Sequence, residues 1–336
     1  MKVYSGYLGV DVGSVSINLI VMDDDNQVIE KLYLRTEGKP ILMLKHGLNL
    51  LHKRLPAGFK ILSVGVTGSG RNLASLMLGA DVVKNEITAH GVAAITFVPD
   101  VKTVLEIGGQ DSKIIIIRDG VIVDFAMNTV CAAGTGSFLD RQASRLNVPI
   151  EEFGIKALKS TTPVRIAGRC AVFAESDMIH KQQLGYNEED IINGLCEALV
   201  RNFINNLGKG KEIIEPIVFQ GGVAANVGIK RAFEKLLEKE IYIPKNFDVM
   251  GAIGVAILAK EHYEKTGHTS FKGFDVADIN YKTKSFECGG CENICEVVQF
   301  IADDKVVARW GDRCGKWSNM SKDGVEAKEG EKKAMA

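Results

Sequence analysis

One short arrangement of strands and turns occurs twice in this chain, and it constrains the fold more than any other feature. In each copy an apolar strand ends in a turn that contains glycine beside a carboxylate, and two further strands follow. The first copy has strands at 7–12, 17–22 and 27–34. The second has strands at 103–107, 113–118 and 121–126, with Asp119-Gly120 as the hairpin turn. We interpret this as a weak internal duplication and expect one copy in each of two lobes.

Helical patterns fill the segments around the two copies. We expect helices at 41–51, 85–97, 138–146, 173–183, 188–207, 223–237 and 250–263, and strands at 61–66 and 216–219. The 336 residues suffice for two lobes with separate cores. The sequence therefore predicts an α/β fold with a first lobe at 1–100, a second at 101–264, a cysteine-rich module at 273–320 and a disordered charged tail at 321–336.

Charge and hydropathy exclude several classes of partner. The net charge is -1, from 41 Lys and Arg against 42 Asp and Glu, so no charge excess favours nucleic acid or an anionic membrane. The N-terminus lacks a basic stretch followed by an apolar one, and the most apolar run, 114–117, is far too short to span a bilayer. We expect a cytoplasmic protein that binds neither nucleic acid nor membrane.

Three glycine-rich turns, each after a strand, predict a nucleotide site. They contain Gly13 with Ser14, Gly108 with Gly109, and Gly221 with Gly222. Glycine lets backbone amides approach phosphate oxygens, and Asp11 and Asp111 beside the first two turns suit a hydrated Mg²⁺. Gln110 could orient a water toward the terminal phosphate. Any one turn alone is more often ordinary, but three in order on duplicated units are not. The chain has neither a P-loop lysine motif nor a dinucleotide-binding glycine motif after its first strand.

Several segments resemble a known family. DVGS (11–14), TGSGR (67–71), IGGQD (107–111) and GGVA (221–224) resemble the actin/Hsp70/sugar-kinase superfamily. CAAGTGSFL (131–139) and CAVFAES (170–176) look like activators of 2-hydroxyacyl-CoA dehydratases and the ATPase subunits of benzoyl-CoA reductases, over roughly 3–259. The resemblance implies a two-lobed, actin-like (duplicated ribonuclease-H-like) ATPase that couples ATP hydrolysis to low-potential electron delivery.

The resemblance also implies residue roles. Asp11, Gln110 and Asp111 would handle magnesium, water and phosphate, and Gly221 and Gly222 would line the adenosine side. One departure is Asn18, because the family usually has a lysine late in this first hairpin. This puts the rate of hydrolysis in doubt more than ATP binding. The implied partners are a second copy of the chain, an iron–sulfur dehydratase or reductase, and a ferredoxin or flavodoxin as the electron source.

Two of the seven cysteines lie just before helical patterns. Cys131 precedes Gly134, Thr135 and Gly136, and Cys170 precedes the helix expected at 173–183. Helix N-termini stabilise thiolates, and a 4Fe–4S cluster wants four of them, which a symmetric dimer would supply. The resemblance implies such a bridging cluster. On the residues alone, two buried thiols and a phosphate-binding role for 134–137 remain open, and we expect Cys196 to pack in the core.

Four further cysteines crowd into the C-terminal stretch. Cys288, Cys291, Cys295 and Cys314 have the spacing C-x2-C-x3-C-x18-C, beside an expected hairpin at 296–301 and 306–310. Three clustered cysteines and a distant fourth favour a second 4Fe–4S cluster slightly over Zn²⁺. The module could be an electron inlet or a docking piece.

We expect ATP binding to close the lobes and tilt the helices at the bridging cluster. Two alternatives remain at this point. A small-molecule kinase could use Asp111 as its base but leaves Cys131 and Cys170 unexplained. A nucleotide-dependent chaperone or filament module would need no iron.

Overall fold

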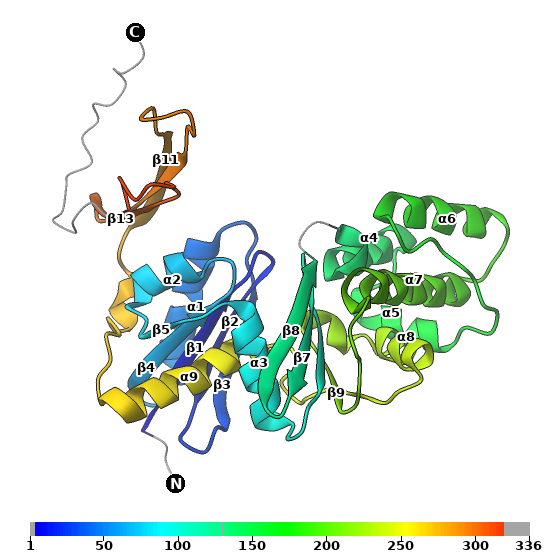
Figure 1. Cartoon of the computed structure of the whole chain (residues 1–336), viewed down its shortest axis with the longest axis horizontal. Coiled ribbons are helices and arrows are strands. Elements are labelled where there is room, and N and C mark those ends of the chain that lie inside the picture. Colours follow the sequence, from blue (N-terminus) through cyan, green and yellow to red (C-terminus); the bar gives the residue numbers. More distant parts are fainter. Residues whose placement is uncertain (1–3, 129–130, 319–336) are drawn as a thin grey trace.

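The computed structural model describes residues 4–128 and 131–318, so the tail expected at 321–336 lies outside the described residues. Two lobes lie side by side, and a small sheet rises from the first lobe (Figure 1). The two lobes each contain a five-stranded sheet of the same plan, in which three antiparallel strands are followed by two parallel ones. The α/β, two-lobed prediction is therefore confirmed.

The first sheet has the order β3-β2-β1-β4-β5. Its central strands are almost wholly buried because helices cover both faces, as is usual for α/β sheets. The elements of this lobe are β1 (Ser5–Val12), β2 (Ser16–Met22), β3 (Val28–Arg35), α1 (Pro40–Arg54), β4 (Lys60–Thr67), α2 (Arg71–Leu78), β5 (Val82–Val83) and α3 (Glu86–Phe97).

The second sheet has the order β10-β9-β6-β7-β8. Its elements are β6 (Thr103–Ile107), β7 (Ser112–Arg118), β8 (Val121–Asn128), η1 (Ala132–Gly134), α4 (Gly136–Leu146), α5 (Ile150–Leu158), α6 (Ala171–Gln183), α7 (Glu188–Phe203), η2 (Ile204–Gly208), β9 (Ile217–Gln220), η3 (Gly222–Ala225), α8 (Val227–Leu237) and β10 (Ile241–Tyr242).

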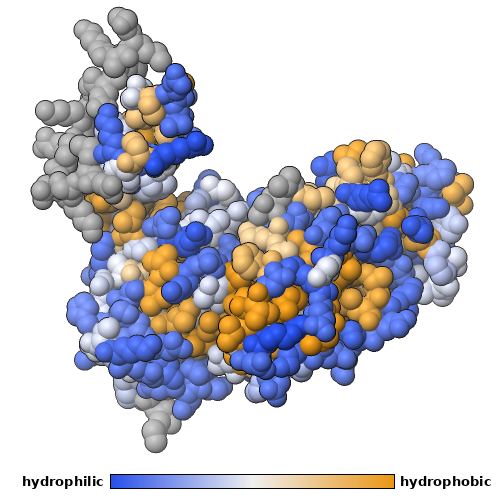
Figure 2. Space-filling model, viewed as in Figure 1, coloured by the Kyte–Doolittle hydropathy of each residue, from blue (hydrophilic) through white to orange (hydrophobic). Residues whose placement is uncertain are grey.

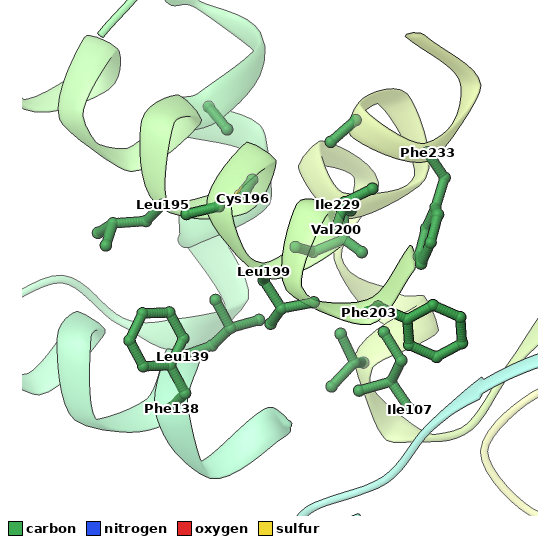
Figure 3. Packing of buried hydrophobic residues seen from close by; sticks show 14 of the residues in the cluster. Ile107, Phe138, Leu139, Leu195, Cys196, Leu199, Val200, Phe203, Ile229 and Phe233 are labelled. Carbon is green, nitrogen blue, oxygen red and sulfur yellow. The ribbon is translucent and has the colours of Figure 1, made fainter. Parts of the chain in front are cut away.

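Helix α7 is the centre of the second lobe. Its side chain Leu199 lies on the side of Leu139 of α4, and Phe203 lies beside Phe233 of α8 and Ile107 of β6 (Figure 3). Phe203 meets Phe233 edge-on at 5.3 Å between ring centroids, an arrangement that aromatic pairs prefer. Cys196 is fully buried in the same cluster, and burial raises its pKa to about 12. The prediction that Cys196 packs in the core is confirmed.

Two helices lie between the sheets. Helix α9 (Met250–Thr266) packs on β1 and β4 although it follows the second lobe in sequence. The range expected for the second lobe, 101–264, thus includes a helix that covers the first sheet. Gly254 of α9 allows close approach to α3, because a Cβ there would lie 1.8 Å from the Ala89 carbonyl oxygen. The other face of α3 packs against the second sheet.

The C-terminal module is a three-stranded antiparallel sheet. It contains η4 (Phe274–Ala277), β11 (Tyr281–Glu287), β12 (Glu296–Ala302) and β13 (Lys305–Trp310). The expected hairpin is confirmed by β12 and β13, whereas β11 was not predicted. Phe300 is buried against the first-lobe core, so the module is attached to that lobe. Among the described residues no helix has the length and apolar character needed to cross a bilayer.

Candidate nucleotide and cysteine sites

The two strand–turn–strand units face each other across the cleft. In the first, Asp11 pairs with Asn18 across the hairpin, and the Gly13 amide donates to the Ser16 carbonyl at 2.9 Å. In the second, the Gly108 amide donates to the Asp111 carbonyl at 3.0 Å. A Cβ on Gly109 would lie 2.6 Å from the Val15 side chain, so glycine is required where the turns meet.

A buried lysine holds three carboxylates together beside these turns. Lys113 Nζ lies 2.8 Å from Glu86, 2.9 Å from Glu106 and 2.8 Å from Asp111, and its side chain is 2% exposed. Burial acts to lower the pKa of Lys113, but the three carboxylates outweigh it and hold that pKa well above its usual value. Burial raises the pKa of Glu106 to about 7. The cluster carries one positive charge against more than one negative charge, so a negative charge remains beside the turns.

Asp11 lies next to this cluster. Desolvation raises its pKa to about 7, and the nearby negative charge of Glu86 adds to the effect. A Cβ on Gly251 would lie 2.3 Å from Asp11 Oδ2, so the N-terminal turn of α9 encloses the carboxylate. Burial lowers the pKa of His90 to about 4, which keeps its ring neutral, and its Nδ1 lies 3.0 Å from Gln220 Nε2.

The turns and the acidic cluster line one cavity of about 100 Å³. Asp11, Gly13, Ser14, Gly108, Gly109, Gln110, Asp111, Gly221 and Gly222 all contribute to its wall. The structure thus brings together all the residues predicted to contact magnesium, phosphate and adenosine, except 134–136.

A second hollow of about 310 Å³ adjoins the first and shares Tyr33, Gly109 and Gly222 with it. Apolar side chains of α4, α5 and α8 line it, together with Asn226 and the charged residues Arg35, Asp140 and Glu151. The buried Asn226 Nδ2 has no hydrogen-bond partner among the described residues. A hollow that combines apolar side chains with an unpaired donor fits a base or ribose, and the glycine turns with Asp11 fit phosphates and Mg²⁺.

Residues 134–136 connect the second turn to Cys131. The amides of Gly136 and Ser137 donate to the carbonyls of Gly108 and Gly109 at 2.9 and 2.8 Å. Ser137 Oγ also donates to the Gly109 carbonyl at 2.6 Å. These amides therefore hold the turn, and Gly136 lines the second hollow. A direct phosphate contact from Gly134, Thr135 or Gly136 stays a prediction.

Cys131 and Cys170 occupy equivalent places. Cys131 is the N-cap residue of η1 and Cys170 that of α6, and both are half-buried. Asn202 of α7 bridges their loops, because its Nδ2 donates to the Gly168 carbonyl and lies 3.8 Å from Cys131 Sγ. Two accessible thiols at helix starts, with an amide donor beside one of them, fit a donor pair for an iron–sulfur cluster.

The four C-terminal cysteines differ in exposure. Cys288 is buried, Cys295 is half-buried, and Cys291 and Cys314 are exposed. Within 4–128 and 131–318, no three His, Cys, Asp or Glu side chains are arranged as a metal site, either here or at Cys131 and Cys170.

Sequence reasoning missed Lys113, Glu86, Glu106, His90 and Asn202. A signal was present for Glu106 and Lys113, because each is a charge beside a run of apolar residues in a buried strand, and the two pair directly across the hairpin. Glu86, His90 and Asn202 lie in helices whose partners are distant in sequence, and no local pattern marks them.

The chain is similar to known ATPases over most of its length. A sequence model of the BadF/BadG/BcrA/BcrD ATPase family matches residues 8–259. The (R)-2-hydroxyglutaryl-CoA dehydratase activating ATPase of Acidaminococcus fermentans is 36% identical over 264 residues, which is 77% of this chain and 98% of that protein. The 2-hydroxyisocaproyl-CoA dehydratase activator of Clostridioides difficile is 32% identical over 257 residues, 75% of this chain and 94% of that one.

Solved structures agree with the sequence comparisons. The structure of the activator of the 2-hydroxyisocaproyl-CoA dehydratase from Clostridium difficile, with bound ADPNP, matches with a TM-score of 0.71 at 30% identity, covering 78% of this chain and 97% of that one. The predicted resemblance is thereby confirmed, and this chain belongs to the BadF/BadG/BcrA/BcrD ATPase family.

Proposed function

We propose that this chain is an ATP-driven electron donor. It hydrolyses ATP and delivers electrons, through a 4Fe–4S cluster shared by two copies of the chain, to a partner iron–sulfur dehydratase or reductase. The observation that carries the proposal is the placement of Cys131 and Cys170 at two helix starts tied together by Asn202 and linked to the phosphate turn.

The residues that line the cavity support the nucleotide-binding part of this proposal. Backbone amides of the first two glycine turns, other than those of Gly13 and Gly108, which are bonded within their turns, would hold the phosphates. Gly221 lines this cavity, and Gly222 lines both it and the hollow for adenosine. Asp11 and Asp111 would hold the hydrated Mg²⁺, and Lys113 fixes the Asp111 carboxylate. Gln110 is exposed at the cavity, where it can orient the water that attacks the terminal phosphate.

A short path of hydrogen bonds and backbone joins the nucleotide turn to Cys131. A displacement of Gly108 and Gly109 on nucleotide binding would be passed to α4 through the three hydrogen bonds from Gly136 and Ser137. Residue 131 lies only five positions before Gly136, across η1. The path gives the nucleotide a mechanical connection to the thiol of Cys131.

The surface around the two cysteine loops and β8, which we call the cysteine face, is suited to binding another protein. Val172 and Phe173, just after Cys170, are 68% and 66% exposed, and Val121, Val123 and Phe125 project from β8. Apolar residues gather over β8 in the middle of the view in Figure 2. Such exposed patches mark surfaces that another protein covers. A cluster bound to two copies through this face would supply one low-potential electron per cycle.

The names of the relatives indicate the partner class. They are activators of 2-hydroxyacyl-CoA dehydratases, and another relative is a component of the benzoyl-CoA reductase of Thauera aromatica, 24% identical over 270 residues. By analogy the acceptor is an iron–sulfur enzyme of this kind, and reduced ferredoxin or flavodoxin supplies the electron. A small-molecule kinase is not favoured, because it gives Cys131 and Cys170 no role.

Iron, sulfide and oligomeric mass of the anaerobically purified protein test the proposal. Cysteines 288, 291, 295 and 314 are first changed to serine so that only the inner pair can bind iron. We expect a dimer with about two irons per chain and an electron resonance signal that changes on adding a non-hydrolysable ATP analogue. Cys170→Ser should lose the iron, whereas Cys196→Ala should keep it. An iron-free, ATP-hydrolysing preparation, or a signal indifferent to nucleotide, would overturn the proposal.

A further inference from the structure

The C-terminal sheet gathers four cysteines at one of its ends. Glu287, the last residue of β11, pairs with Glu296, the first of β12. Cys288 and Cys295 directly flank this pair, and the Cys288 amide donates to the Cys295 carbonyl at 2.8 Å. Cys291 lies in the loop thus closed. Since β13 runs antiparallel to β12, its last residue, Trp310, reaches the same end.

The segment after β13 folds back over this end. Gly311 has a φ of 105°, and a Cβ there would lie 2.3 Å from the Glu296 carbonyl oxygen, so the turn requires glycine. The Trp317 amide donates to Asp312 Oδ2 at 2.8 Å and closes a loop that contains Cys314. Cys314 is therefore held near the loop of Cys288.

The surroundings of Cys288 suit a metal-bound thiolate. The Trp317 indole N–H donates to Cys288 Sγ at 3.2 Å, and the Gly290 amide also hydrogen-bonds to this sulfur. The Trp317 ring packs edge-on against Phe286, with centroids 4.9 Å apart. N–H donors to sulfur and a packed ring are the outer contacts that orient metal ligands.

The loop itself is poorly stabilised without a ligand. Ile294 is 59% exposed and has a φ of 39°, a region that β-branched residues rarely adopt. The sheet buries Val297, Phe300 and Ile301, but the cysteine loops lie beyond this small core. Small modules of this kind commonly use a metal as a staple.

We propose that Cys288, Cys291, Cys295 and Cys314 form a tetrathiolate site for a thiophilic metal centre, either Zn²⁺ or a 4Fe–4S cluster. The family match ends at residue 259, so this site is separate from the nucleotide cleft and from the inner cysteine pair. In the described part of the chain no three of these side chains are arranged as a metal site, so binding would require the exposed Cys291 and Cys314 to move toward Cys288.

The test uses the full-length protein, purified anaerobically, with metal and sulfide measured per chain. We expect either about one zinc, or about four irons and four sulfides beyond those of the inner site. Cys291→Ser and Cys314→Ser should lose this metal, and because both side chains are exposed the fold should tolerate the change. Cys131→Ser, aimed at the inner site, should retain it, as should Cys196→Ala.

A titration of metal-free protein gives a second readout. Co²⁺ alone should produce the sulfur-to-metal absorption of a four-thiolate site, and Zn²⁺ should displace it. Trp317→Phe keeps the ring contact with Phe286 but removes the N–H, and we expect about 10-fold weaker zinc affinity. Equal metal content in wild type, Cys291→Ser and Cys314→Ser, with no such absorption in wild type, would overturn the proposal.

Discussion

At the scale of single residues, Lys113 supplies the positive charge that stabilises three carboxylates in the cleft. Lys113→Met leaves Glu86, Glu106 and Asp111 without their shared cation in a buried site. We expect the free energy of unfolding to fall by about 3–5 kcal/mol at neutral pH, the usual result of breaking a buried ion pair. Chemical denaturation of the nucleotide-free protein measures it.

The pH dependence of the free energy of unfolding shows whether Lys113→Met loses stability through electrostatics or through a packing defect. Without the lysine the folded state binds protons on these carboxylates more tightly than the unfolded state does, so the variant should recover stability as the pH falls. The double variant Lys113→Met with Glu106→Gln should recover part of the lost free energy of unfolding at neutral pH. Lys282→Met, which breaks an exposed ion pair with Asp304, is the control and should cost less than about 1 kcal/mol. A deficit that does not change with pH would contradict this account.

Asp11 predicts the pH dependence of magnesium binding. Its pKa of about 7 means that protons compete with Mg²⁺ for the carboxylate near neutrality. Mg²⁺ affinity should weaken by up to about 10-fold per pH unit below pH 7, measured by Mg²⁺ titration of ATPase activity between about pH 6 and 8. Without Mg²⁺, the free energy of unfolding changes with pH in the opposite direction to Mg²⁺ affinity. The folded state binds the Asp11 proton more tightly than the unfolded state does. The contribution of Asp11 to stability is therefore greatest below its usual pKa and is lost as the pH rises through 7.

Two substitutions test whether Asp11 causes the pH dependence of Mg²⁺ affinity. Asp11→Asn should abolish the pH dependence along with most activity. Glu106→Gln should leave the pH dependence in place, although the pKa of Glu106 is also about 7, because Lys113 already occupies that carboxylate. Magnesium affinity that stays constant over this pH range would show that Asp11 is not a ligand.

The residues at the turns could be predicted from sequence because each glycine and carboxylate acts next to its own strand. Asp11, Gln110 and Asp111 needed only the strand before them to be placed in the cleft. Glu86 and Lys113 meet only after α3 has packed beside the second sheet. No local pattern contains that contact.

At the scale of elements, α7 positions the two cysteine loops through Asn202. Asn202→Leu keeps the volume but removes the amide that binds the Gly168 carbonyl and approaches Cys131 Sγ. We expect the iron bound at the inner site to fall at least about twofold and its midpoint potential to shift, since hydrogen bonds to sulfur tune such centres. Metal analysis and a redox titration measure the two effects.

The control lies on the same helix. Among the described residues the Asn193 side chain hydrogen-bonds to Glu197, at 3.5 Å, and not to the cysteine loops, so Asn193→Leu tests the cost of an apolar residue in α7. A loss of stability in Asn202→Leu with unchanged iron and potential would make Asn202 merely structural.

Element prediction succeeded where periodicity is local and failed where it is not. The expected helix at 223–237 is interrupted, because η3 ends at Ala225 and Asn226 then caps α8 with its side chain. The helix expected at 188–207 changes to a π-turn from Ile204. Helices α2 and α5 were not predicted, since each has only two turns, too few for a clear 3.6-residue period.

At the scale of the whole molecule, the contact between α3 and α9 is where the lobes are joined. The lobe closure that we expect on ATP binding would require these helices to slide or rotate against each other, as packed helices do in domain closure. Sequence could suggest two lobes from the duplication, but it could not assign α9 to the first sheet, because that contact joins residues more than about 160 positions apart.

Gly254→Ala tests whether this contact controls closure. The added Cβ would lie 1.8 Å from the Ala89 carbonyl oxygen, so the helices must separate, and we expect a loss of about 1–3 kcal/mol of stability. Because the separated helices no longer fit the closed arrangement, the decrease in radius of gyration on adding a non-hydrolysable ATP analogue should be smaller than in wild type, as measured by small-angle X-ray scattering. Gly289→Ala, where a Cβ meets nothing within 4 Å, should behave like wild type. If Gly254→Ala loses stability but contracts fully with nucleotide, the hinge lies elsewhere and the helix contact serves only to hold the lobes together.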